Sequence, residues 1–296
     1  MGVEEVFALV RSIGERTTPL CVSALEAELG DLPMVVSFPV FRETLRCCYS
    51  MALESGFKYL LTCDADVVPY AGSVDELLRL NREVPTHYFQ VVCRVDDHLF
   101  GKPRTGGMRL YRVSALQLAL SELASSDATR PESSLVRSLG GHGRPSAYCD
   151  SVIGMHDAGQ YLADVYRTAY FFAHKHAASI PELAAHWRAA QSGSSDLRVA
   201  LAGLADGLQS SDPGPDARSF NPASAAAVLE RLGLYELAPI DGDDLAEWLD
   251  RRAPLRRMTR WTTYPSPRGL ARSAELRRNE QSILADFVRR LWRARQ

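Results

Sequence analysis

The sequence predicts an α/β protein with a mostly parallel sheet flanked by helices, followed by a helical C-terminal appendage. Two observations predict this fold class. Apolar, strand-like runs alternate with helix-like segments in the N-terminal part, joined by short polar links, which is typical of parallel sheets with right-handed crossovers. Hydrophobic residues make up 46% of the 296 residues, which is enough for a large core.

The N-terminal elements follow one another in strict alternation. We expect a strand at 6–12, a helix at 19–29, a strand at 34–38, a helix at 41–55 and a strand that begins at 58. Pro19 suits the first turn of its helix, Thr18 its N-cap, and Gly30 its end. Because ligands of α/β proteins bind at the carboxyl ends of strands, the loops after these strands are expected to form one crevice.

The later elements are a helix, a strand pair and further helices. We expect a helix at 73–81, strands at 88–95 and 108–112 around a polar, glycine-rich excursion, helices at 114–125 and 132–139, and a long helix after 157. Pro, Ser, Asp and Gly are frequent in residues 209–222, as in linkers. The predicted domains are a catalytic domain at 1–190, a linker with a short helix at 191–222, and a helical, Arg-rich region at 223–296.

The net charge of −2 conceals a basic C-terminal tail. Residues 251–296 contain 13 Arg against three acidic residues, which makes the remaining chain acidic. We hypothesise that residues 271–296 bring the protein to an anionic acceptor or membrane surface. No apolar run is long enough to span a bilayer, so membrane contact is expected to be peripheral, at the inner face, and the protein cytoplasmic.

Neither a zinc site nor a nucleic-acid partner is expected. The six cysteines show no zinc-ligand spacing, and we interpret them as reduced thiols. The basic tail contains no recognised nucleic-acid motif, so nucleic acid is not an expected partner.

Two carboxylates follow the apolar run at 59–61. Asp64 and Asp66 would share one face if the strand continued through them, and Ala65 leaves room between them. Buried carboxylates need a strong partner, and their oxygens suit a hard divalent cation such as Mg2+ or Mn2+. The alternative is an Asp-rich turn that caps the next helix.

These features resemble nucleotide-sugar glycosyltransferases of the GT-A fold, especially bacterial family 2-like enzymes. The resemblance depends on the strand that ends in D-A-D, the earlier V-R-S-I-G-E-R-T-T and the later G-M-H-D, and covers about residues 6–176. It implies a Rossmann-type sheet, a nucleoside-diphosphate sugar donor, a divalent metal (Mn2+ or Mg2+) and a glycan, lipid-linked or small-molecule acceptor.

The resemblance also implies roles for individual residues. The implied nucleotide-binding residues are Arg11, Ser12, Glu15, Arg16, Arg42 and Asp64. Asp66 is the better candidate for direct metal coordination, with Asp64 contacting the ribose or the metal through water. A late histidine commonly completes the metal site, and His156 has the matching position. The competing histidines are His142, His174 and His176.

Glu132, at the start of a helix, is the candidate catalytic base or acceptor clamp, acting beside Asp66. It is equally suited to be a favourable acid in the first turn of its helix. Asp96, Asp97 and Asp157 are held in reserve as alternatives to Glu132. The candidate donor- or acceptor-binding residues are Lys102, Arg104, Gly106, Gly107 and Asp157. The loop at 101–107 could equally be a hairpin connection.

Two other functions compete with this interpretation. In a phosphatase of the haloacid dehalogenase type, Asp64 would attack phosphorus and Asp66 would protonate the leaving group. That motif usually opens its domain, whereas two strand–helix units precede it here, and no convincing later Lys and Asp pair follows. The other alternative is a non-catalytic, transferase-like protein that binds a partner through its basic tail.

Overall fold

The computed structural model describes residues 2–125, 130–175, 179–210, 222–250, 254–258 and 261–264. The chain folds as two compact units: the first runs to Gly159 and resumes at Pro239, and the second spans Gln160–Ala238. This division differs from the predicted boundary at residue 190. The basic segment 271–296, to which we assign surface binding, lies outside the described residues.

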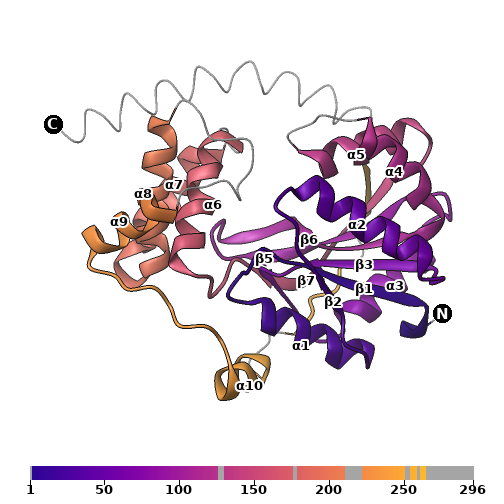
Figure 1. The fold of residues 1–296 in the computed structure, drawn as a ribbon, viewed down its shortest axis with the longest axis horizontal. Helices are drawn as coiled ribbons and strands as arrows, with labels where there is room; N and C mark the ends of the chain where they lie inside the picture. The colour runs from indigo at the N-terminus through magenta and orange to yellow at the C-terminus, as the bar shows by residue number, and fades with distance from the viewer. Residues whose placement is uncertain are drawn as a thin grey trace. The chain divides into compact units, whose positions relative to one another are not determined.

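In the described part of the chain, the first unit contains one sheet of eight strands (Figure 1). Their bounds are β1 Val6–Arg11, β2 Met34–Val36, β3 Tyr59–Asp64, β4 Val67–Pro69, β5 Gln90–Asp97, β6 Lys102–Arg112, β7 Ser146–His156 and β8 Trp261–Tyr264. The strand order is β2-β1-β3-β6-β5-β7-β4, and β8 also pairs with β7. The predicted α/β class is confirmed.

The sheet is mixed in its pairing but mostly parallel in strand direction. β1 is parallel to β2 and β3, β6 is antiparallel to β3 and β5, and β7 is parallel to β5. β4 and β8 each run antiparallel to β7. Five strands therefore run one way, whereas β4, β6 and β8 run the other way.

Helices cover both faces of the sheet (Figure 1). On β3, the side chains of Tyr59, Leu61 and Cys63 enter a core with helices α1 and α3, whereas Leu60 enters the core with α2, α4 and α5. The helix bounds are α1 Thr18–Leu29, α2 Phe41–Glu54, α3 Ser73–Glu83, α4 Leu116–Ala124 and α5 Pro131–Gly141. This period-two alternation is what a strand buried on both faces requires.

Two local predictions are corrected. The polar stretch predicted as an excursion at 96–107 is mostly strand, because β5 continues to Asp97 and β6 begins at Lys102. The long helix after 157 begins later, as α6 Leu162–Lys175, because Asp157 and Gly159 take positive φ angles of 59° and 69° that end regular structure. β4, β7 and β8 were not predicted as strands. β4 and β8 are short and lack a periodic signal, whereas β7 has 11 residues and was missed.

The second unit is helical in its described part. After α6 it contains α7 Ile180–Ala190, α8 Ser195–Gln209 and α9 Pro222–Leu232. Gly203 and Gly207 let α8 approach α6 closely, since a Cβ at either would lie within 2.4 Å of a backbone carbonyl oxygen of α6. In the first unit, α10 Gly242–Asp250 packs on α1. No helix in the described ranges is long and apolar enough to cross a membrane.

Candidate functional site

The carboxyl ends of three strands meet at one edge of the sheet. β3 ends at Asp64, β5 at Asp97 and β7 at His156, and β5 places Asp97 opposite His156 in register. The short strand β4 brings Val67 opposite His156 from the other side. The backbone N–H of Asp157 donates to the carbonyl of Asp66 at 3.0 Å, which ties the turn after β3 to the end of β7.

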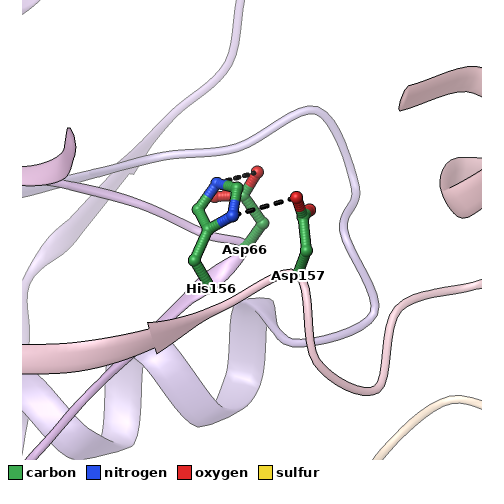
Figure 2. Close-up of side chains that lie close together, drawn as sticks. All are labelled: Asp66, His156 and Asp157. Atoms are coloured by element: carbon green, nitrogen blue, oxygen red, sulfur yellow. Dashed lines mark ion pairs between the residues drawn. The ribbon is translucent and has the colours of Figure 1, made fainter. Parts of the chain in front are cut away.

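Asp66, His156 and Asp157 form a compact cluster at this edge (Figure 2). The Nε2 of His156 lies 3.5 Å from Asp66 Oδ2, and its Nδ1 lies 2.9 Å from Asp157 Oδ2. One ligand atom from each residue lies within 4.8 Å of the others. Among the described residues, Asp66 Oδ1 is buried without a hydrogen-bond partner. An imidazole and two carboxylates are a donor set that fits a divalent cation.

The backbone around the cluster is specialised. Asp157 is the one described residue other than glycine that has a positive φ, a conformation that costs about 1 kcal/mol in a residue with a Cβ. Gly107 on β6 has φ of 78°, and a Cβ there would lie 2.4 Å from Val67 Cγ2 and 3.7 Å from His156 Cδ2. Glycine at 107 therefore lets β6 pass directly against the cluster.

Burial and mutual charge perturb the titration of the cluster. Burial raises the pKa of Asp66 to about 8, against the lowering effect of His156. Burial alone would lower the pKa of His156, but the carboxylates of Asp157 and Asp66 outweigh it and raise that pKa well above its usual value. When both carboxyls are ionised, Asp66 and Asp157 carry more negative charge than the imidazole balances, which adds to burial in favouring protonation of Asp66.

A further carboxylate, that of Asp97, supports His156 from behind. It is fully buried and lies 3.0 Å from His156 Nδ1. Asp97 also accepts from Arg104 Nε and from the Phe100 N–H, the latter at 2.8 Å. Burial would raise the pKa of Asp97, but the hydrogen bond with His156 and the charge of Arg104 lower it to about 2. Asp97 is therefore an ionised, fixed partner of the imidazole.

Asp64 belongs to a different cluster, on the other side of the strand end. Its Oδ1 forms an ion pair with Arg11 Nε at 2.8 Å, and Arg11 Nη1 reaches Glu132 Oε1 at 2.8 Å. Glu132 also binds Arg109 at 3.0 Å and the hydroxyl of Tyr111 at 2.8 Å. Because β3 ends at Asp64, the alternation that would place Asp64 and Asp66 on one face does not extend to Asp66. The metal role predicted for Asp64 stays a prediction.

Glu132 is held as the anion of this ion-pair cluster. Burial would raise its pKa, but the charges of Arg109 and Arg11 lower it to about 2. A carboxylate so stabilised is a weak proton acceptor near neutral pH, so the geometry favours a positioning role over that of a base. Sequence reasoning missed Arg109 and Tyr111, because only the pairing of β6 with β3 places them beside Arg11.

Polar groups of the loop after β1 form hydrogen bonds with one another. Ser12 Oγ and the Ile13 N–H both donate to Glu15 Oε2 at 2.7 Å, and Ser12 Oγ lies 2.9 Å from Thr18 Oγ1. The helix cap is Thr17, not the predicted Thr18, and its hydroxyl donates to the Ala65 carbonyl at 2.7 Å. That bond fixes the loop against the turn that carries Asp66.

Of the remaining predicted site residues, Arg16 lies near the Asp66 cluster. Arg16 Nη1 donates to the Gly159 carbonyl at 2.8 Å, two residues beyond Asp157, and Arg42 is half-buried in the first turn of α2. Lys102 is exposed at the start of β6. The competing His142 is an exposed partner of Glu122. Of the other competing histidines, His174 belongs to α6 in the second unit, and His176 lies outside the described residues.

The similar solved structures described below are distant from this chain. No model of a protein family matches the sequence, and no curated protein matches it. Solved structures that are similar include a glycosyltransferase involved in glycosylation of the major capsid of PBCV-1, with a TM-score of 0.36, 12% identity and coverage of 49% of this chain and 82% of that chain. A mannosyltransferase from Pyrobaculum calidifontis, solved in complex with GDP-Man and Mn2+, has a TM-score of 0.37, 15% identity and coverage of 84% of both chains.

A third similar structure is A197 from STIV, with a TM-score of 0.31, 16% identity and coverage of 38% of this chain and 66% of that chain. At these identities and TM-scores the likenesses carry no functional weight. The function is therefore inferred from the side chains of this chain.

Proposed function

We propose that this chain is a metal-dependent glycosyltransferase that moves a sugar from a nucleoside-diphosphate sugar to a hydroxyl acceptor. The observation that carries the proposal is the cluster of Asp66, His156 and Asp157, whose ligand atoms lie within 4.8 Å of one another at the carboxyl edge of the sheet. That edge is where α/β proteins bind nucleotides and other ligands.

In this proposal the three residues hold a divalent cation, Mn2+ or Mg2+. The buried, unpaired Oδ1 of Asp66 supports this assignment, since such an oxygen is costly without a partner. A bound cation supplies Lewis-acid stabilisation for the charge on the departing diphosphate. Asp97 keeps the imidazole of His156 oriented through the 3.0 Å contact to Nδ1.

The neighbouring side chains suit the rest of a nucleotide sugar. Asp64 keeps 32% of its side chain exposed while Arg11 holds one carboxylate oxygen, so the other is available to a ribose hydroxyl. Arg16, fixed on the Gly159 carbonyl, and Arg104 can meet phosphate oxygens with planar guanidinium groups. In this proposal Glu132 positions Arg11 and leaves proton removal from the acceptor to another group.

Titration calorimetry tests the proposal. UDP, GDP and dTDP are titrated into the full chain with Mn2+, with Mg2+ and with EDTA, for the wild type, Asp66→Ala and the matched control Asp150→Ala. Asp150 is a partly exposed carboxylate paired with Arg94. We expect one nucleotide to bind only with metal, and that binding to be lost in Asp66→Ala but kept in the control. The preferred nucleotide then directs a screen of its sugar conjugates for release of the diphosphate.

Two outcomes would contradict the proposal. Nucleotide binding that is indifferent to EDTA would remove the metal from the mechanism. Turnover of p-nitrophenyl phosphate that needs Asp64, without metal-linked binding of any nucleotide, would favour the phosphatase instead.

A further inference from the structure

Arg104 brings a permanent positive charge into contact with the candidate metal ligands. Its Nη2 lies 3.3 Å from both ring nitrogens of His156, and its Nε is bonded to Asp97. The Arg104 side chain is 30% exposed, whereas that of Asp97 is fully buried. One edge of the guanidinium is therefore anchored inside the protein while the rest reaches the surface of the site.

Three carboxylates surround His156, and they can neutralise either the Arg104 guanidinium or a bound divalent cation. Asp66, Asp97 and Asp157 all lie within 3.5 Å of the His156 ring, and Arg104 partly neutralises them. A divalent cation on His156 would be next to a guanidinium that cannot lose its charge. Charges of the same sign repel strongly at such distances when they are partly buried. The guanidinium must therefore weaken the binding of a cation to this cluster while it stays against the imidazole.

A diphosphate would remove this conflict. A guanidinium forms paired hydrogen bonds with phosphate oxygens, and these are among the strongest that side chains make. Arg104 lies over the ring of Phe100 at 5.1 Å, a contact that supports the guanidinium without binding its donors. Its donors can therefore turn from His156 to an anion at the surface of the site.

We infer that Arg104 couples the two ligands of the site: it opposes a divalent cation on His156 until a diphosphate engages the guanidinium, so that metal and nucleotide bind cooperatively. The inference rests on the proposed function and adds to it a thermodynamic role for one residue. Coupling of this kind is reciprocal, so the factor by which nucleotide strengthens metal binding equals the factor by which metal strengthens nucleotide binding.

The experiment measures Mn2+ affinity by electron paramagnetic resonance of the free ion, alone and with saturating UDP, GDP or dTDP. The variants are Arg104→Gln, the charge-conserving Arg104→Lys and the control Arg94→Gln, which removes an exposed arginine paired with Asp150. We expect Arg104→Gln to bind Mn2+ alone about tenfold more tightly than the wild type, and to show about tenfold weaker coupling to the nucleotide. Arg104→Lys and Arg94→Gln should stay close to the wild type for Mn2+ alone.

The outcomes separate the inference from the proposed function. Wild-type Mn2+ binding that Arg104→Gln leaves unchanged or weakens would overturn the inference and leave the metal site intact. Absence of Mn2+ binding in the wild type and in Arg104→Gln, with and without nucleotide, would overturn both. If Arg104→Gln binds Mn2+ without nucleotide and the wild type does not, the inference is supported, because the guanidinium is then what opposes the ion.

Discussion

Two charged clusters lie at the same edge of the sheet, and they are balanced in opposite ways. Around Glu132, two arginines and a tyrosine hydroxyl satisfy the carboxylate, and its pKa falls to about 2. Around His156, carboxylates are in excess, one oxygen of Asp66 has no hydrogen-bond partner among the described residues, and the pKa of Asp66 rises to about 8.

The contrast separates a structural cluster from a binding cluster. A buried carboxylate whose two oxygens are bonded by two arginines and a tyrosine hydroxyl holds β1, β6 and α5 together but gains little from a further ligand. A buried carboxylate with an unpaired oxygen is costly by itself and is stabilised when a cation arrives. The two carboxylates of D-A-D, only two residues apart, fall on opposite sides of this division.

Among the substitutions that test this contrast, Glu132→Ala is expected to have the largest effect, which is on stability. Removing this carboxylate leaves Arg11 and Arg109 buried without their shared partner, and we expect the free energy of unfolding to fall by about 3–5 kcal/mol. Urea denaturation followed by circular dichroism measures the loss. Glu43→Ala, which removes an exposed helical carboxylate paired with Arg46, is the control and should change stability much less. A Glu132→Ala variant with wild-type stability and no turnover would restore Glu132 as the base.

The pH dependence of stability should reveal the same ion pair. Because the pKa of Glu132 is about 2 in the folded chain against a reference of 4.5, its contribution is complete above pH 4.5 and is lost as the pH falls toward 2. The difference in unfolding free energy between wild type and Glu132→Gln should therefore shrink by about 3 kcal/mol across that window. Urea titrations at several pH values measure it. A difference that does not vary with pH would mean that Glu132 is not ionised by its arginines.

Substitution of the two aspartates of D-A-D should have different effects: at Asp66 on Mn2+ affinity, and at Asp64 on stability. We expect Asp66→Asn to weaken Mn2+ binding by about 100-fold, an energy of about 2.7 kcal/mol, without loss of stability, since a buried charged oxygen that has no partner is costly to the folded chain. Asp64→Asn should weaken Mn2+ binding by less than about tenfold and destabilise the fold, because Arg11 loses one of its two carboxylates. Calorimetry with Mn2+ and urea denaturation of both variants make the comparison. Equal loss of metal affinity would place Asp64 among the ligands.

The smallest expected effect concerns the backbone of Asp157. Asp157→Gly and Asp157→Ala both remove the carboxylate, so both should bind Mn2+ about tenfold more weakly than the wild type. They should differ in stability, because glycine adopts φ of 59° freely and alanine does not. We expect the glycine variant to be more stable by about 1 kcal/mol, measured by urea denaturation. Equal stabilities would mean that the turn relaxes in the variants.

Sequence reasoning identified the elements whose signals are local. The strands at the start of the chain, the helix stop at Gly30 and the position of Glu132 near a helix start match β1 to β3, α1 and α5. Strands were predicted at 88–95 and 108–112, but the end of β5 and the first half of β6 were taken for a polar excursion, because Asp97, Lys102 and Arg104 have no strand-like pattern. Asp97 was held only in reserve, although its place at a strand end was visible in the sequence.

The amino-acid sequence by itself determined the α/β class, the order of the N-terminal elements and the concentration of acidic residues after the third strand, since these follow from local periodicity and turn chemistry. The tertiary structure alone decided the partners of those acids. Asp64 meets Arg11 because β1 and β3 pair in register, and Asp66 meets His156 because β4 turns back onto the end of β7. Register between distant strands depends on the packing of the whole sheet, and a single sequence carries no direct record of it.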